Sequence, residues 1–156
     1  MKGTYLLILQ LNQSLDQLPV GRLGTFSFPP GYYLYVGSAF GAGGLTARLN
    51  HHQHPEKARP HWHIDYLRSY THLREVWSIA LQQRLEGCWC QSLVEHFAVP
   101  VRGFGASDSP CVAHLLYSSI FPAAETLSWT LFKSVSFADT NGQKLSITIH
   151  SYPSIS

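Results

Sequence analysis

The chain has 156 residues, of which 45% are hydrophobic, 13% are charged and 13% are aromatic, and its net charge is +2. This length is sufficient for one domain with a packed core, and the lack of any apolar run near ~20 residues excludes a membrane-spanning helix. The small positive charge is weak support for an anionic partner, and the first five residues lack a signal-peptide pattern. Three cysteines are too few for a disulfide scaffold, so we expect a cytoplasmic protein with free thiols.

The first part of the chain predicts strands separated by turn residues. Residues 3–11 are rich in Leu, Ile and Tyr, which is typical of a buried strand, and residues 18–24 carry turn residues. Residues 25–28 and 32–38 predict two further strands with Pro29-Pro30-Gly31 as the turn between them. Because that turn is short, we expect these two strands to pair antiparallel.

The middle of the chain predicts helices and one more strand. Residues 45–52 have helical spacing, which places Arg48 and His52 on one face, one turn apart. The further elements predicted here are a helix over 62–67, a strand over 76–81, a helix over 85–97 and a Gly/Ser loop over 103–109.

The last part of the chain, residues 113–156, has a β-like composition. Asn141-Gly142 is a strong turn signal, and we expect it to join a strand over 132–137 to a strand over 145–149. The fold class predicted from all these elements is α+β: a small antiparallel sheet flanked by helices, with an extra C-terminal β segment.

Two tyrosine signatures carry the best functional signal. Gly3-Thr4-Tyr5 opens the first predicted strand, and Tyr35-Val36-Gly37 closes the third. Cleavage of a phosphodiester needs an activated water, a neutralised phosphate charge and a stabilised leaving oxygen. Two tyrosines, the Arg48–His52 pair and a later carboxylate suit that chemistry. The alternative is that both tyrosines are ordinary core or hairpin residues.

The order of these residues resembles the GIY-YIG nuclease superfamily. Five longer strings resemble its Uri-type endonuclease branch: residues 21–24, 35–39, 43–49, 61–67 and 103–108. The resemblance implies a GIY-YIG-like nuclease domain over residues 1–117, with residues 118–156 as a C-terminal β extension packed on the same domain.

The resemblance also implies roles for individual residues. Tyr5 is expected to activate the water and Tyr35 to orient it, Arg48 to bind the scissile phosphate through two N–H groups, and His52 to donate to the phosphate or shuttle the proton. Glu86 is the expected ligand for Mg²⁺ or Mn²⁺, with Glu95 as its competitor. The substrate-binding residues implied are Gly37, Ser38, His61, His63, Asp65, Asp108 and His114.

This sequence departs from the family pattern at two cysteine positions. Gly87 follows Glu86, and Ser109 follows Asp108, where the family usually has cysteine. A different reading of the same region is a structural zinc site, because His-x-His and Cys residues are zinc ligands elsewhere. The residues available for it are His61, His63, Cys88, Cys90, Cys111 and His114.

We therefore expect a metal-dependent endonuclease that hydrolyses DNA phosphodiester bonds, directed by DNA structure or damage, as in DNA repair. DNA is the expected partner, no membrane is involved, and a protein partner could supply specificity. Two alternatives stay open: an inactive nucleic-acid-binding module of the same fold, and a small zinc-binding structural protein. The sequence leaves the oligomeric state open.

Overall fold

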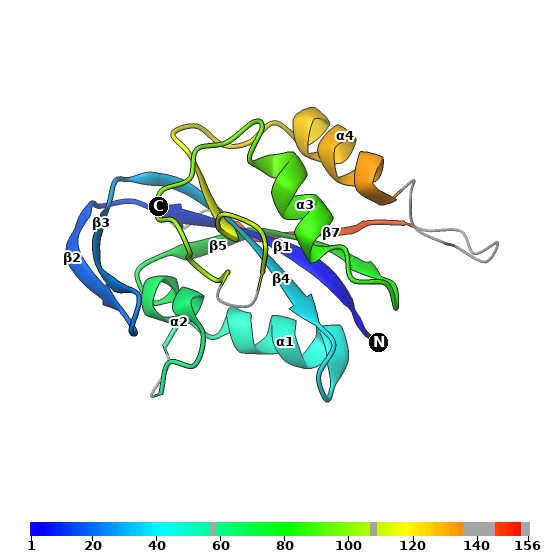
Figure 1. Cartoon of the computed structure of the whole chain (residues 1–156), viewed down its shortest axis with the longest axis horizontal. Helices are drawn as coiled ribbons and strands as arrows, with labels where there is room; N and C mark the ends of the chain where they lie inside the picture. Colours follow the sequence, from blue (N-terminus) through cyan, green and yellow to red (C-terminus); the bar gives the residue numbers. More distant parts are fainter. Residues whose placement is uncertain (57–58, 107–108, 136–145, 154–156) are drawn as a thin grey trace.

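The computed structural model describes residues 1–56, 59–106, 109–135 and 146–153 (Figure 1). Within them the fold class is α+β, as predicted, and no described helix has the length and apolar character needed to cross a membrane. The strands are β1 (Gly3–Leu11), β2 (Leu15–Val20), β3 (Gly24–Phe28), β4 (Gly31–Ala39), β5 (His72–Ala80), β6 (Leu115–Ser118) and β7 (Thr148–Ser151). The helices are α1 (Gly44–Gln53), α2 (His63–Arg68), α3 (Glu86–Leu93) and α4 (Ala124–Val135).

A five-stranded antiparallel sheet in the order β6-β4-β1-β5-β7 lies at the centre of the fold. Figure 1 shows α1 and α2 on one side of it and α3 and α4 on the other. The central strand β1 is buried on both faces: Tyr5, Leu7 and Leu9 pack in the core on the α1–α2 side, and Leu6 and Ile8 in the core on the α3–α4 side. Two buried faces make a continuous apolar run, which explains why residues 3–11 alternate poorly.

The predicted pairing of residues 25–28 with residues 32–38 is wrong. β3 pairs with β2, a strand that includes residues assigned to a turn, and β4 pairs with β1 and β6. The tight turn lies between β2 and β3, where the Leu23 N–H donates to the Val20 carbonyl at 3.0 Å and Gly21 has a φ of 50°. Gly31, with a φ of 145°, lies where the chain leaves β3 for β4. The most apolar strands therefore pair at the centre of the sheet, and the β2–β3 ribbon forms a separate two-stranded sheet.

The C-terminal region contains both a strand and an unexpected helix. β7 pairs antiparallel with β5 at the sheet edge, so a C-terminal β segment is present. The β assignment of residues 124–135 is wrong, because they form α4. Leu127, Leu131 and Val135 recur every four residues and are buried in the core that also contains α3, which is the pattern of an amphipathic helix. The predicted Asn141-Gly142 hairpin turn lies outside the described residues.

Candidate active site

The two tyrosine signatures lie on neighbouring strands. In the β1–β4 register Tyr5 is opposite Gly37 and Tyr35 is opposite Leu7. Because side chains alternate along a strand, Tyr5 and Tyr35 both point to the sheet face that α1 and α2 cover, where both are in the same core. Although thirty positions separate them in the chain, their strands are direct neighbours in the sheet.

Gly37 makes room for the ring of Tyr5. A Cβ at position 37 would lie 2.7 Å from Cε2 of Tyr5 and closer still to Cζ and the hydroxyl oxygen. Gly37 is itself buried and does not line the adjoining cavity. Its place beneath the ring gives this glycine a positioning role. Ser38 pairs with Thr4 in the same register, and it does not line the cavity either.

Helix α1 brings Arg48 and His52 to the first tyrosine. The hydroxyl of Tyr5 lies 2.7 Å from Nε2 of His52, and Nε of Arg48 donates to the same hydroxyl at 3.5 Å. The Arg48 guanidinium lies 3.6 Å from the centre of the Trp62 ring, a cation–π stack that leaves the N–H edge of the guanidinium for a ligand. The helix is anchored at its start by the Leu45 N–H, which donates to the Met1 carbonyl at 2.8 Å.

Burial makes both phenols harder to ionise than an exposed tyrosine. Burial raises the pKa of Tyr5 to about 12, although the Arg48 charge and hydrogen bond lower it in part. Burial also raises the pKa of Tyr35 well above its usual value, and neighbouring Tyr5 adds to this effect. The Glu86 carboxylate raises the pKa of both phenols further. A positive charge placed near Glu86 would therefore favour their ionisation.

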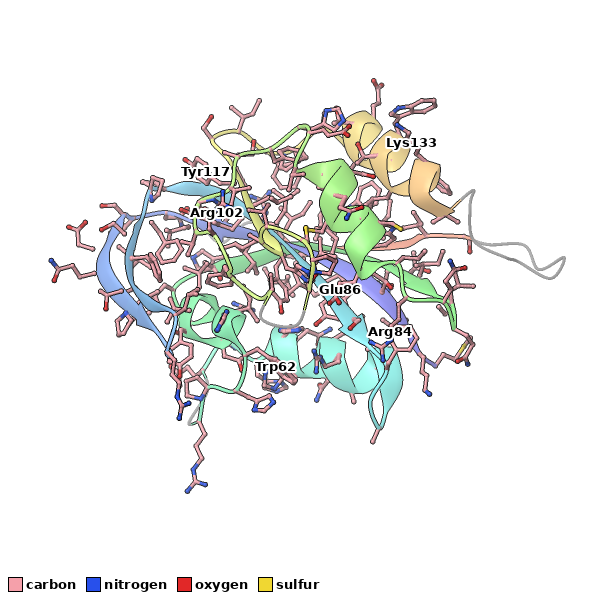
Figure 2. All side chains as sticks on the ribbon, in the orientation of Figure 1. Trp62, Arg84, Glu86, Arg102, Tyr117 and Lys133 are labelled. Atoms are coloured by element: carbon pink, nitrogen blue, oxygen red, sulfur yellow. A yellow bond between two sulfur atoms is a disulfide. The ribbon has the colours of Figure 1, made fainter. Side chains whose placement is uncertain are left out.

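A cavity of about 390 Å³ opens beside this group. Its lining residues are Tyr35, Arg48, His61, Trp62, His63, Arg84, Glu86, Gly105, Ser109 and His114. Tyr5 and His52 do not line it and are buried, with 0% and 1% of their surface exposed. Figure 2 shows Glu86 and Arg84 near the start of α3 and Trp62 beside α1. The cavity thus has two arginines from separate parts of the chain, Arg48 in α1 and Arg84 in the segment between β5 and α3.

Glu86 is the first residue of α3, and β1 holds that end of the helix. The Leu85 N–H donates to Oγ1 of Thr4 at 3.2 Å, so the helix begins beside the strand that carries Tyr5. Among the described lining residues Glu86 is the one with a carboxylate, and it is partly exposed. One carboxylate in an open polar cavity suits Mg²⁺, which keeps several of its water ligands. Glu95 is exposed beyond the end of α3 and does not line the cavity.

The predicted histidines and aspartates fall into two groups. His61, His63 and His114 line the cavity, and Nδ1 of His63 accepts the Gly105 N–H at 2.8 Å. Burial lowers the pKa of His63. Asp65 does not line the cavity; its carboxylate accepts the backbone N–H groups of His61 and Trp62 at 2.9 and 3.0 Å and so supports the start of α2. Asp108 lies outside the described residues.

Sequence reasoning missed four lining residues as site residues: Trp62, Arg84, Gly105 and Ser109. Arg84 and Ser109 stand close to predicted site residues, two before Glu86 and one after Asp108, so proximity in the chain was the available signal. Arg84 is held over the Phe40 ring at 4.4 Å. Phe40 follows β4, and this contact has no signature in the sequence.

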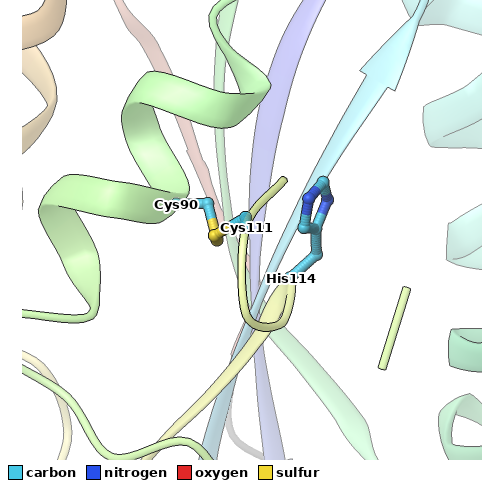
Figure 3. A group of neighbouring side chains, drawn as sticks. All are labelled: Cys90, Cys111 and His114. Atoms are coloured by element: carbon cyan, nitrogen blue, oxygen red, sulfur yellow. A yellow bond between two sulfur atoms is a disulfide. The ribbon is translucent and has the colours of Figure 1, made fainter. Parts of the chain in front are cut away.

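The expectation of free thiols is wrong for two of the three cysteines. Cys90 in α3 and Cys111 in the loop before β6 form a disulfide, with an S–S distance of 2.10 Å. His114 lies beside them (Figure 3), and these three residues could together approach one metal ion. With both sulfurs bonded to each other, however, neither is a thiolate ligand. Cys88 is an exposed free cysteine, apart from this group.

One comparison with known proteins identifies a family. The model of the family described as "Domain of unknown function DUF123" matches residues 4–136, from β1 to just beyond the end of α4. Comparison with curated proteins and with solved structures gives no match.

Proposed function

The chain belongs to the DUF123 family, and we propose that it is a metal-dependent endonuclease of GIY-YIG type that hydrolyses DNA phosphodiester bonds. The observation that carries the proposal is that candidate catalytic residues from separate elements meet at one cavity. Tyr35, Arg48 and Glu86 come from β4, α1 and α3 and line the same cavity, with Tyr5 and His52 hydrogen-bonded to each other beside it. A phenol, a guanidinium and a carboxylate around one polar cavity are the groups that phosphodiester hydrolysis uses.

Arg48 is the group best placed to bind the scissile phosphate. Its stacking on Trp62 fixes the plane of the guanidinium, and a fixed plane favours bidentate contact with two phosphate oxygens. Arg84 adds a second positive charge to the cavity lining. Two arginines suit a polyanion such as the DNA backbone, with binding that weakens as salt rises.

The proposed division of work between the two tyrosines follows the sequence-based expectation and pairs Tyr5 with His52. Tyr35 meets the cavity, so it is the phenol that contacts and orients the attacking water. Tyr5 lies behind with its hydroxyl 2.7 Å from Nε2 of His52, so a proton that reaches this hydroxyl can pass on to the imidazole. A divalent cation held by Glu86 would stabilise the phosphate charge and offset the carboxylate's effect on both phenols.

The substrate proposal is DNA whose structure or damage exposes a single phosphodiester to the cavity, as in DNA repair, with a protein partner supplying further specificity. The test uses supercoiled, single-stranded and branched DNA, each with Mg²⁺, Mn²⁺ or EDTA. We expect metal-dependent cleavage that falls at least ~100-fold in Arg48→Ala and in Glu86→Gln. Two exposed residues distant in the chain provide matched controls, Arg22→Ala and Glu125→Gln.

Three results would separate the alternatives. Cleavage that persists in both site variants would reject the nuclease proposal. Salt-sensitive DNA binding by the wild-type protein without cleavage under any metal condition would favour an inactive nucleic-acid-binding module, an alternative supported by the raised pKa values of both phenols. Stoichiometric zinc in the purified protein would favour the structural zinc protein.

A further inference from the structure

Ser109, His114 and Glu86 stand in series at the wall of the cavity. The hydroxyl oxygen of Ser109 lies 2.9 Å from Nε2 of His114, and Oε2 of Glu86 lies 3.5 Å from Nδ1 of the same ring. All three residues line the cavity, although they come from a loop, the approach to β6 and the start of α3. Serine, histidine and a carboxylate in this order form the arrangement that activates a serine as a nucleophile.

The hydrogen bonds around His114 favour the tautomer that this arrangement needs. Nδ1 is buried and makes no hydrogen bond within the described part of the chain, and the Glu86 carboxylate is the acid that faces it. With the proton on Nδ1, Nε2 has its lone pair directed at Ser109 and accepts the O–H. The Ser109 oxygen in turn accepts the Cys111 N–H at 3.1 Å. A separation of 3.5 Å is long for a hydrogen bond, and such contacts commonly tighten when a ligand binds.

The disulfide holds the serine loop against the helix that carries the acid. Cys90 lies one turn after Glu86 in α3, and Cys111 supplies the N–H that contacts Ser109. Figure 3 shows Cys90 on α3 and Cys111 on the adjoining loop, with His114 close to both. The backbone of His114 is fixed as well, because its N–H donates to the Phe104 carbonyl at 2.8 Å. Each member of the series therefore sits on a segment that covalent or backbone bonds restrain.

We propose that Ser109 is a nucleophile for anionic phosphoesters, with His114 as its general base and Glu86 orienting the imidazole. The cavity lining decides the substrate class. Arg48 and Arg84 provide positive charge for phosphoryl oxygens. The residue after Ser109 is Pro110, which has no N–H to stabilise the oxyanion of a carboxylic ester at the position where serine hydrolases commonly place one.

The reaction is a double displacement. The Ser109 oxygen forms a bond to phosphorus as its proton passes to Nε2 of His114. The bond between phosphorus and the leaving alcohol breaks, and the leaving oxygen takes the proton from His114. In the second step His114 removes a proton from water, the hydroxide attacks phosphorus, and the Ser109 oxygen leaves and recovers its proton. Water is the co-reactant, and neither step needs an oxidant or a reductant.

This activity uses the same cavity as the proposed DNA cleavage, including Arg48 and Glu86, but its test does not depend on that cleavage. The full-length protein is incubated in EDTA with a fluorophosphonate probe, which forms a stable bond to an activated serine with loss of fluoride, and the adduct is mapped by mass spectrometry. We expect one adduct, at Ser109, in the native protein and none in the urea-denatured protein. Ser109→Ala should abolish it, whereas Ser27→Ala, at an exposed serine in β3, should leave it unchanged.

The roles of the base and of the cationic cavity have separate readouts. His114→Gln should label at least ~100-fold more slowly, because a general base typically contributes that much. His114 is buried, so circular dichroism must first show that the variant is folded. Inorganic phosphate should protect Ser109 in the wild-type protein, a measurement that needs no variant. Equal labelling of native and denatured protein, an adduct that survives Ser109→Ala, or the absence of protection by phosphate would overturn the proposal.

Discussion

Replacing Gly37 by alanine tests whether this glycine positions Tyr5. The added methyl group would lie 2.7 Å or less from three atoms of the Tyr5 side chain, whereas ordinary contacts begin near 3.4 Å. The ring is fully buried, so it has to move away by a substantial part of an ångström. Overpacking of this kind typically costs 1–3 kcal/mol, so we expect the free energy of unfolding to fall by about 2 kcal/mol. The midpoint of thermal unfolding should fall by roughly 4–8 °C.

The same displacement should impair cleavage more than it impairs folding. Moving the Tyr5 hydroxyl breaks its 2.7 Å contact with His52, and a misplacement near 1 Å in a catalytic group typically costs ~100-fold in rate. The assays are urea denaturation and metal-dependent nicking of DNA, at a temperature where the variant is folded. A double-mutant cycle with Tyr5→Leu isolates the ring–methyl contact, and we expect a coupling of at least about 1 kcal/mol.

Gly41→Ala is the matched control. A Cβ at position 41 meets no atom within 4 Å, so stability and cleavage should match those of the wild-type protein. If Gly37→Ala behaves like Gly41→Ala in both assays, or if the cycle with Tyr5→Leu gives no coupling, the proposed positioning of Tyr5 by Gly37 is refuted.

Three further predictions concern stability. Burial raises the pKa of Tyr5 to about 12, whereas an unfolded phenol titrates near 10, so the folded state binds the proton more tightly. The free energy of unfolding should therefore fall between about pH 10 and 12, and this fall should be roughly 3 kcal/mol larger in the wild-type protein than in Tyr5→Phe. Arg68 is buried and donates to the His52 and Thr71 carbonyls at 2.7 and 2.9 Å. Urea denaturation should show that Arg68→Met lowers the free energy of unfolding by about 3–5 kcal/mol. The control Arg59→Met, at an exposed position, should change it by no more than about 0.5 kcal/mol. Burial opposes ionisation of Asp65, but hydrogen bonds from Trp62, His61 and His51 outweigh it and hold the pKa of this carboxyl below 3.8. The stability that Asp65 contributes is therefore present at neutral pH and is lost as the pH falls through the folded pKa. In acid titration Asp65→Asn should lose less free energy of unfolding than the wild-type protein, and an equal loss in both would contradict this account.

Much of the fold could be predicted because local patterns carried it. The apolar run of β1 and the helical spacing of α1 are local features, and each gave the correct element type. The errors arose where pairing depends on distant segments. No local sequence feature shows whether β3 pairs with β4 or with β2, because a short turn connects β3 to each of these strands. Residues 124–135 were misassigned because aromatic and β-branched residues outweighed the four-residue spacing of Leu127, Leu131 and Val135.

The candidate site shows the same division. The residue types and their order pointed to Tyr5, Tyr35, Arg48, His52 and Glu86, and these lie in or beside one cavity. The sequence could not indicate which tyrosine lines that cavity, because both side chains point to the same face of the sheet. They differ only in which residues pack over them in the folded protein. It also could not reveal the pairing of Cys90 with Cys111, because that bond depends on how the loop before β6 folds back over α3.

The sequence by itself therefore determined most of the element types and most of the candidate chemical groups, since periodicity and residue type are properties of short segments. Only the tertiary structure decided the order of the strands, the burial that raises the pKa values of Tyr5 and Tyr35, and the alignment of Ser109, His114 and Glu86. These features depend on distances between residues far apart in the chain, and such distances are set only once the sheet has formed and its two faces are covered.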